Sequence, residues 1–99
     1  MQDHIQTSGR FATPNGAKYL AQLCKHFGHK IPAEVAEDGS SGEVRFAIGQ
    51  ALMQADGQGL TATLRGEDQA ALDQLRHIID DHLKRFAFRE GFEAMDWAA

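Results

Sequence analysis

The order of apolar and polar positions predicts a β-strand followed by a helix at the start of the chain. Over residues 5–11, apolar or small side chains alternate with polar ones, a period typical of a strand with one buried face. Thr13 and Pro14 predict the start of a helix, because Thr can accept a hydrogen bond from a free backbone amide and Pro has no amide to lose there. Apolar side chains then recur every three or four residues up to Phe27, and Gly28 is predicted to end the helix.

Residues 33–65 predict four further strands, because short alternating runs are separated by turn-forming residues, as in an antiparallel meander. The four runs cover residues 33–37, 43–48, 51–55 and 60–65. The second run alternates most clearly and the first is the weakest. Gly49 and Gln50 predict a tight turn between the second and third runs.

After Glu67 the period becomes helical, and Asp68 is predicted to cap the N-terminus of this second helix. Six apolar side chains at helical spacing form its stripe: Leu72, Leu75, Ile78, Ile79, Leu83 and Phe86. The order of strand, helix, four strands and helix predicts an α+β two-layer sandwich. Both helices bury their stripes on one face of an antiparallel sheet and leave the other face polar and open.

Residues 1–99 are predicted to form a single domain, because 99 residues with 42% hydrophobic and 24% charged side chains match one ordinary globular unit. The tail, residues 88–99, carries Phe88, Phe92 and Trp97. Exposed aromatic clusters are costly in water, so we expect the tail either to dock on its own chain or to bury against a second copy in a homodimer.

Charge and hydropathy narrow the range of partners. A formal net charge of −4 without a basic cluster speaks against nucleic acid. No apolar run approaches the roughly 20 residues that span a bilayer, and residues 1–10 lack the apolar stretch of a secretory signal. Cys24 is the one cysteine, which rules out an internal disulfide framework and fits a reducing compartment. We therefore expect a cytoplasmic protein that does not bind membranes.

Three segments carry a family resemblance. They are residues 12–15, 23–30 and 82–90, which read ATPN, LCKHFGHK and HLKRFAFRE. Together they resemble a bacterial family of chains of this length, known as domain-of-unknown-function family 2218. The resemblance implies no established activity. It implies an association with flavin-dependent siderophore-interacting reductases, and thus a context of iron handling. The strand order is similar to that of TATA-binding-protein-like domains and of the last domain of phosphohexomutases.

Five histidines and one cysteine suggest a metal site, because imidazole and thiolate are ligands of zinc, iron and copper. The candidate ligands are Cys24, His26, His29 and His82. Regular helical geometry turns Cys24 and His26 about 200° apart, and His29 follows the predicted helix end. In the alternative interpretation, Cys24 is a core side chain and the two histidines are cations near a helix carboxyl end. This alternative is favoured, so iron or zinc is a hypothesis and no cofactor is expected.

His82 lies among the apolar residues of the second helix, where a buried imidazole needs a hydrogen-bond partner. The favoured interpretation is a core histidine bonded to a backbone carbonyl or to Tyr19. The functional interpretation is a ligand or proton-transfer group that His82 shares with His26.

Arg10, Arg45 and Arg65 occupy outward positions on three predicted strands and therefore lie on the open face. They are the candidate binding residues for an anionic ligand, another protein or a second copy. Alternatively the face is simply solvated, with Arg45 paired to Glu43 or another acid.

Catalysis has little support in the sequence. A reactive thiolate needs exposure and a cationic setting, whereas Cys24 is predicted to be buried. We therefore expect a non-catalytic binding or accessory domain, with iron handling and a siderophore-interacting reductase as the implied context. The alternatives are a homodimeric protein-interaction module and a small Cys/His-dependent enzyme.

Overall fold

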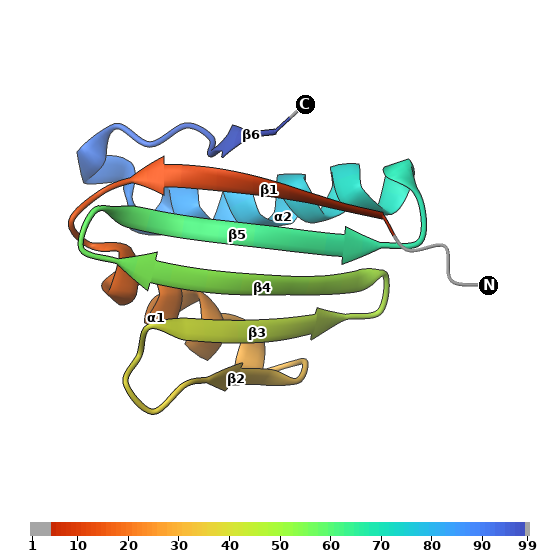
Figure 1. Cartoon of the computed structure of the whole chain (residues 1–99), viewed down its shortest axis with the longest axis horizontal. Coiled ribbons are helices and arrows are strands. Elements are labelled where there is room, and N and C mark those ends of the chain that lie inside the picture. The colour runs from red at the N-terminus through yellow and green to blue at the C-terminus, as the bar shows by residue number, and fades with distance from the viewer. Residues whose placement is uncertain (1–4, 99) are drawn as a thin grey trace.

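Six antiparallel strands form one sheet, and two helices cover one of its faces in the computed structural model (Figure 1), which describes residues 5–98. The strand order is β2-β3-β4-β5-β1-β6. In chain order the elements are β1 (Ile5–Ala12), α1 (Gly16–Gly28), β2 (Ala33–Val35), β3 (Ser41–Phe46), β4 (Gly49–Asp56), β5 (Gly59–Gly66), α2 (Gln69–Phe86), the 3-10 turn η1 (Phe88–Glu90) and β6 (Asp96–Trp97). The predicted α+β two-layer sandwich is confirmed, with β6 as a short strand beyond the predicted ones.

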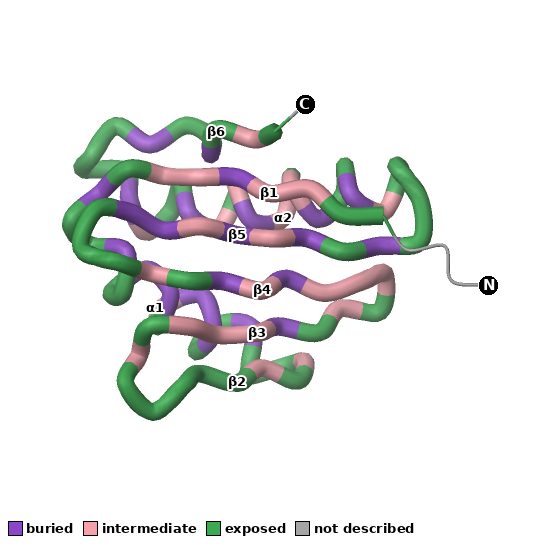
Figure 2. The backbone as a smooth tube through the Cα atoms, in the orientation of Figure 1, coloured by how far each residue is buried: buried purple, intermediate pink, exposed green. Residues whose placement is uncertain are grey.

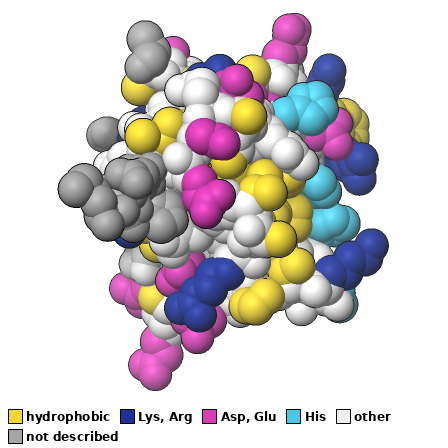
Figure 3. All heavy atoms as spheres, turned by 90° about the vertical axis from the view of Figure 1, so that its right-hand side faces the viewer, with side chains coloured by type: hydrophobic (Ala, Val, Ile, Leu, Met, Phe, Trp, Pro, Cys, Tyr) yellow, Lys and Arg dark blue, Asp and Glu magenta, His cyan; other side chains and the backbone are white. Residues whose placement is uncertain are grey.

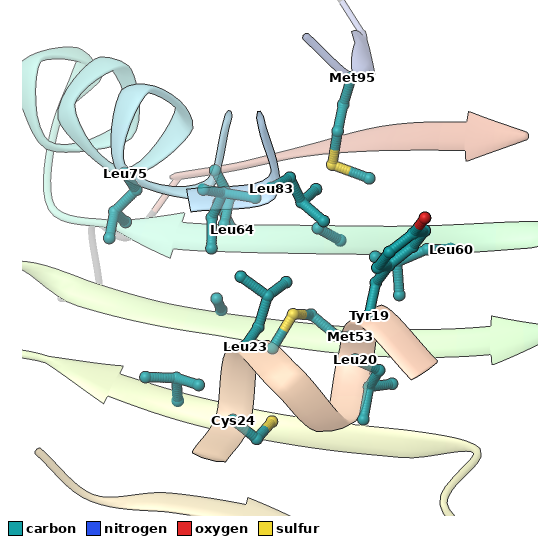
Figure 4. Packing of buried hydrophobic residues seen from close by; sticks show 14 of the residues in the cluster. Tyr19, Leu20, Leu23, Cys24, Met53, Leu60, Leu64, Leu75, Leu83 and Met95 are labelled. Atoms are coloured by element: carbon teal, nitrogen blue, oxygen red, sulfur yellow. The ribbon is translucent and has the colours of Figure 1, made fainter. Parts of the chain in front are cut away.

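The two helices and the sheet bury one continuous apolar layer. α1 contributes Leu20, Leu23, Cys24 and Phe27, whereas α2 contributes Leu72, Leu75, Ile79 and Leu83. From the sheet come Val44, Ala51, Met53, Leu60, Ala62 and Leu64. Figure 4 shows labelled members of this layer, such as Leu23, Leu64 and Leu75, between the helices and the strands, and Figure 2 shows that burial concentrates on the central strands. The apolar stripes read from the sequence therefore face the sheet, as predicted.

The turn between β3 and β4 lies two residues earlier than predicted. Ala47 and Ile48 form it, and Phe46 is in register with Gly49. Gly49 instead begins β4, with φ 156°, and a Cβ atom there would collide with the carbonyl oxygen of Arg65. The glycine is thus required by the close approach of β5 and does not mark the turn.

The helix starts differ in how well they match the prediction. Asp68 caps α2 as expected, and its carboxylate accepts a hydrogen bond from the Ala71 amide at 2.9 Å. Thr13 does not cap α1, whose N-cap position is Asn15. The Thr13 hydroxyl accepts a bond from the Asn15 amide at 3.1 Å, which closes a small turn just before the helix.

The aromatic tail docks on its own chain. β6 pairs with β1, and the Trp97 ring lies directly over Gly9, where any Cβ atom would collide with it. Asp80 of α2 accepts hydrogen bonds from the Met95 amide at 2.9 Å and from Trp97 Nε1 at 2.8 Å. Phe92 is buried, whereas Phe88 is 62% exposed. The tail residues that motivated a homodimer are therefore largely used within the chain.

No helix in the described part of the chain combines the length and the apolar character needed to cross a membrane.

We expect Leu75→Ala to lower the free energy of unfolding by about 2–5 kcal/mol, because Leu75 is fully buried and its loss adds a cavity to the lost burial. Leu52→Ala is the matched control, since Leu52 lies on the open face and is only partly buried. It should cost about 1 kcal/mol or less in the same denaturant titration. Equal costs for the two variants would mean that the buried face of the sheet has been wrongly assigned.

Candidate functional site

Two histidines from different helices meet in a groove beside the sheet. His26 lies near the end of α1 and His82 in the last third of α2, and their ring centroids are 4.8 Å apart. The Phe27 ring is 4.7 Å from His82, and the Phe86 ring is 6.3 Å from His26. Figure 3 shows histidine side chains along the helix side of one end of the molecule, next to exposed hydrophobic side chains. The helix packing therefore creates the His26–His82 proximity that the sequence only suggested.

A backbone contact fixes the orientation of the His82 ring. Its Nδ1 atom lies 2.7 Å from the carbonyl oxygen of Ile78, one turn earlier in α2. A carbonyl can only accept, so Nδ1 carries the hydrogen and, in the neutral ring, Nε2 is left with a free lone pair. The partner is thus a backbone carbonyl, one of the two predicted, and Tyr19 bonds elsewhere.

The electrostatic setting favours a neutral His26. Desolvation of the ring lowers its pKa most, and His82, Arg85, His29 and Lys30 lower it further through their positive charge. Arg85 is itself paired with Asp81 at 3.1 Å. The lowered pKa favours the neutral form of the His26 ring, which is the form that can bind a metal ion or accept a proton.

A small hollow lies at the histidine pair. Its volume is about 200 Å³, enough for an ion with a few waters or for a small ligand group. The lining residues are His26, Phe27, Lys30, Ile31 and His82. The hollow thus has an apolar wall, two imidazoles and one ammonium group.

The other two predicted metal ligands lie elsewhere. Cys24 is 3% exposed, and its Sγ atom lies 3.9 Å from the Glu34 carbonyl oxygen, on the side of α1 that faces the sheet. Burial raises the pKa of this thiol, so it stays protonated and is a poor ligand or nucleophile. His29 is exposed beyond the end of α1. Within residues 5–98 no three or more His, Cys, Asp or Glu side chains are grouped so that they could hold a metal ion.

The three open-face arginines do not form one cluster. Arg10 bonds to Thr61 at 2.7 Å and to Asp56 at 3.2 Å. Arg45 donates from Nε to Glu43 at 3.0 Å, which is the pairing expected for a solvated face. Arg65 shares a row across the sheet with Arg45, whereas Arg10 lies in the row of Thr61, four residues along β5. Only Arg45 and Arg65 are therefore brought near each other.

A polar cluster that the sequence did not reveal ties the tail to the start of α1. The Glu90 carboxylate accepts hydrogen bonds from Thr13 Oγ1 at 2.7 Å, from Asn15 Nδ2 at 3.0 Å and from the Tyr19 hydroxyl. These bonds lower the pKa of Glu90, whereas burial and the Glu90 charge raise the pKa of Tyr19 to about 12. Thr13, Asn15 and Glu90 all belong to segments that carry the family resemblance, which is the one signal that could have pointed to them.

Removing the Glu90 carboxylate tests this cluster. Glu90→Ala leaves the buried Thr13 and Tyr19 hydroxyls without their acceptor, so we expect a loss of about 1–3 kcal/mol in unfolding free energy at neutral pH. Glu93→Ala, an exposed position in the same tail, is the control and should cost little.

The pH dependence of this loss has a definite sign. Because the folded-state pKa of Glu90 is lowered, its stabilisation is present above the ordinary value of 4.5 and is lost as pH falls through the folded-state pKa. The difference in free energy of unfolding between the parent protein and Glu90→Ala, measured by urea unfolding, should therefore become smaller in acid. The assignment would be contradicted if this difference stayed constant with pH. It would also be contradicted if Glu90→Ala and Glu93→Ala lost the same unfolding free energy at neutral pH.

Two comparisons find relatives of this chain. Residues 8–98 match the model of a family described as "Uncharacterized protein conserved in bacteria (DUF2218)". The NMR structure of PA4090 from Pseudomonas aeruginosa is similar at 27% sequence identity, with 94% of each chain covered and a TM-score of 0.77. A search of curated proteins finds no match. Neither description indicates iron handling or catalysis, so the chemistry of the groove has to be argued from its own geometry.

Proposed function

The chain belongs to the bacterial family DUF2218, and we propose that it is a non-catalytic binding domain that holds a divalent transition-metal ion between His26 and His82. The observation that carries this proposal is the pair of imidazoles, one from each helix, beside a hollow open to the surface. The family description supplies no activity, whereas in the groove two imidazole rings line one hollow with their centroids 4.8 Å apart.

The spacing of the two rings suits one shared ion. Two imidazoles bound to a tetrahedral ion, each with a metal–nitrogen distance of about 2.1 Å, have ring centres about 5 Å apart. The observed separation of 4.8 Å is close to this value. Metal-binding histidines also commonly donate their second ring N–H to a carbonyl oxygen, which His82 does to Ile78. The contact with Ile78 therefore orients the His82 ring and leaves the Nε2 lone pair available to bind a metal ion.

The surroundings limit the affinity. Two protein nitrogens leave the remaining coordination positions to water or to a small ligand. Lys30 lines the hollow, and its positive charge opposes a cation, whereas the charge of Arg85 is offset by Asp81. We therefore expect weak, reversible binding instead of a permanently held structural ion.

The identity of the ion is a further part of the proposal. The implied association with siderophore-interacting reductases makes iron a candidate, with an accessory role beside such an enzyme in the cytoplasm. Imidazole sites bind iron(II) more weakly than zinc or copper(II). Zinc is therefore the practical probe of the site, whichever ion occupies it in the cell.

Calorimetric titration of the untagged chain with zinc chloride tests the proposal. We expect one equivalent to bind reversibly, and His26→Ala and His82→Ala each to abolish saturable binding because each removes one of two ligands. His77→Ala is the control, since His77 is exposed on α2 outside the groove, and it should bind zinc like the parent protein. The site would be refuted if the parent protein showed no saturable zinc binding, or if His77→Ala lost zinc binding as His26→Ala and His82→Ala do.

A further inference from the structure

Arg65 differs from the other arginines in the described part of the chain. Four arginines form ion pairs, Arg10 with Asp56, Arg45 with Glu43, Arg76 with Asp73 and Arg85 with Asp81. The Arg89 guanidinium lies over the Phe88 ring at 5.7 Å. Arg65 has no ion pair, side-chain hydrogen bond or aromatic contact of this kind within residues 5–98, although it sits in the middle of a sheet.

The strand register places Arg65 in a row of hydrogen-bonding side chains. Gln50 lies directly opposite Arg65 on the neighbouring strand β4, and Arg45 on β3 lies directly opposite Gln50. Gln6 on β1 is opposite Arg65 on its other side. Residues in register on adjacent strands point to the same face, so these four side chains share the face opposite the helices, which no described element covers in Figure 1.

This row borders a shallow hollow at the end of the sheet. The hollow has a volume of about 400 Å³ and lies beside the β3–β4 turn. Arg45, Gln50 and Arg65 line it, together with residues 46–49 and Glu67, which lies between β5 and α2. Two guanidinium groups and an amide thus face one concave surface, with the Glu67 carboxylate in the same lining. A second carboxylate, Glu43, accepts hydrogen bonds from Arg45 Nε at 3.0 Å and from Gln50 Nε2 at 2.7 Å, so an anion competes with Glu43 for these two groups.

The chemistry of this surface favours a small anion. Guanidinium groups bind carboxylate and phosphate oxygens in a two-pronged geometry, and no side chain within residues 5–98 accepts a hydrogen bond from Arg65. Arg45 and Arg65 are two strands apart, a backbone separation of about 10 Å, so a ligand with two anionic groups can engage both. The net charge of −4 disfavours long polyanions such as nucleic acid, which would meet the acidic remainder of the surface.

We propose that Arg65 and Arg45, with Gln50 between them, form a binding site for a small ligand that carries two or more carboxylate or phosphate groups. The site is independent of the His26–His82 groove, because it lies on the opposite face of the sheet. Arg10, the third arginine predicted for this face, is not part of it, because it lies opposite Thr61, four residues along β5 from Arg65.

Titration of the ¹⁵N-labelled protein with citrate, and separately with pyrophosphate, tests the site and distinguishes the two kinds of anion. Binding should shift the amide signals around Gln50 and Arg65 and saturate below about 10 mM. Arg65→Gln should weaken the affinity about two- to fivefold, and Glu67→Gln should strengthen it by a similar factor because it removes one of the two carboxylate charges near the site.

Arg76→Gln is the matched control, since Arg76 lies on α2, away from the open face, and it should leave the affinity unchanged. Saturation by one of the two anions alone supports the site and names its chemistry as carboxylate or phosphate. The site would be refuted if neither anion saturates, or if Arg76→Gln weakens binding as much as Arg65→Gln does.

Discussion

The two helices bury their apolar stripes against the same face of one sheet, and the positions of both candidate sites follow from this packing. α1 packs mainly against β2, β3 and β4, whereas α2 packs mainly against β5, so the helices lie next to each other and their facing sides meet over the sheet. His26 and His82 come together on these facing sides. With both helices on one side, the opposite face keeps its polar side chains in water, including the row that contains Arg65.

The tail completes this arrangement without adding a second core. β6 extends the sheet beyond β1, Trp97 covers Gly9, and Asp80 fastens the returning chain to α2. Just beyond the C-terminal end of β1, the Glu90 carboxylate accepts hydrogen bonds from hydroxyl and amide groups around the start of α1. Through Asp80 and Glu90, the C-terminal segment thus contacts both α2 and the start of α1. The contacts of the tail also use most of the apolar surface that would otherwise favour a homodimer through the tail.

The sequence predicted the layers of this fold well, because periods of two and of about 3.6 residues report directly which face is buried. It misplaced the turn before β4, since Gly49 is dictated by the neighbouring Arg65 backbone and not by the turn itself. Alternation placed three arginines on the open face, but only the strand register could separate Arg10 from the other two. The Glu90 cluster joins residues 71 to 77 positions apart, a separation at which no local pattern gives a signal.

The state of the His82 ring tests the proposed metal site most directly. Long-range ¹H–¹⁵N correlation of the histidine side chains reports which ring nitrogen carries the hydrogen. At mildly alkaline pH we expect His82 to be protonated at Nδ1 and bare at Nε2, because Nδ1 is bonded to the Ile78 carbonyl. Adding one equivalent of zinc should then shift His82 Nε2 and one nitrogen of His26, and leave His77 unchanged. A His82 ring protonated at Nε2, or zinc-induced shifts as large at His77 as at His82, would contradict a metal site in the groove.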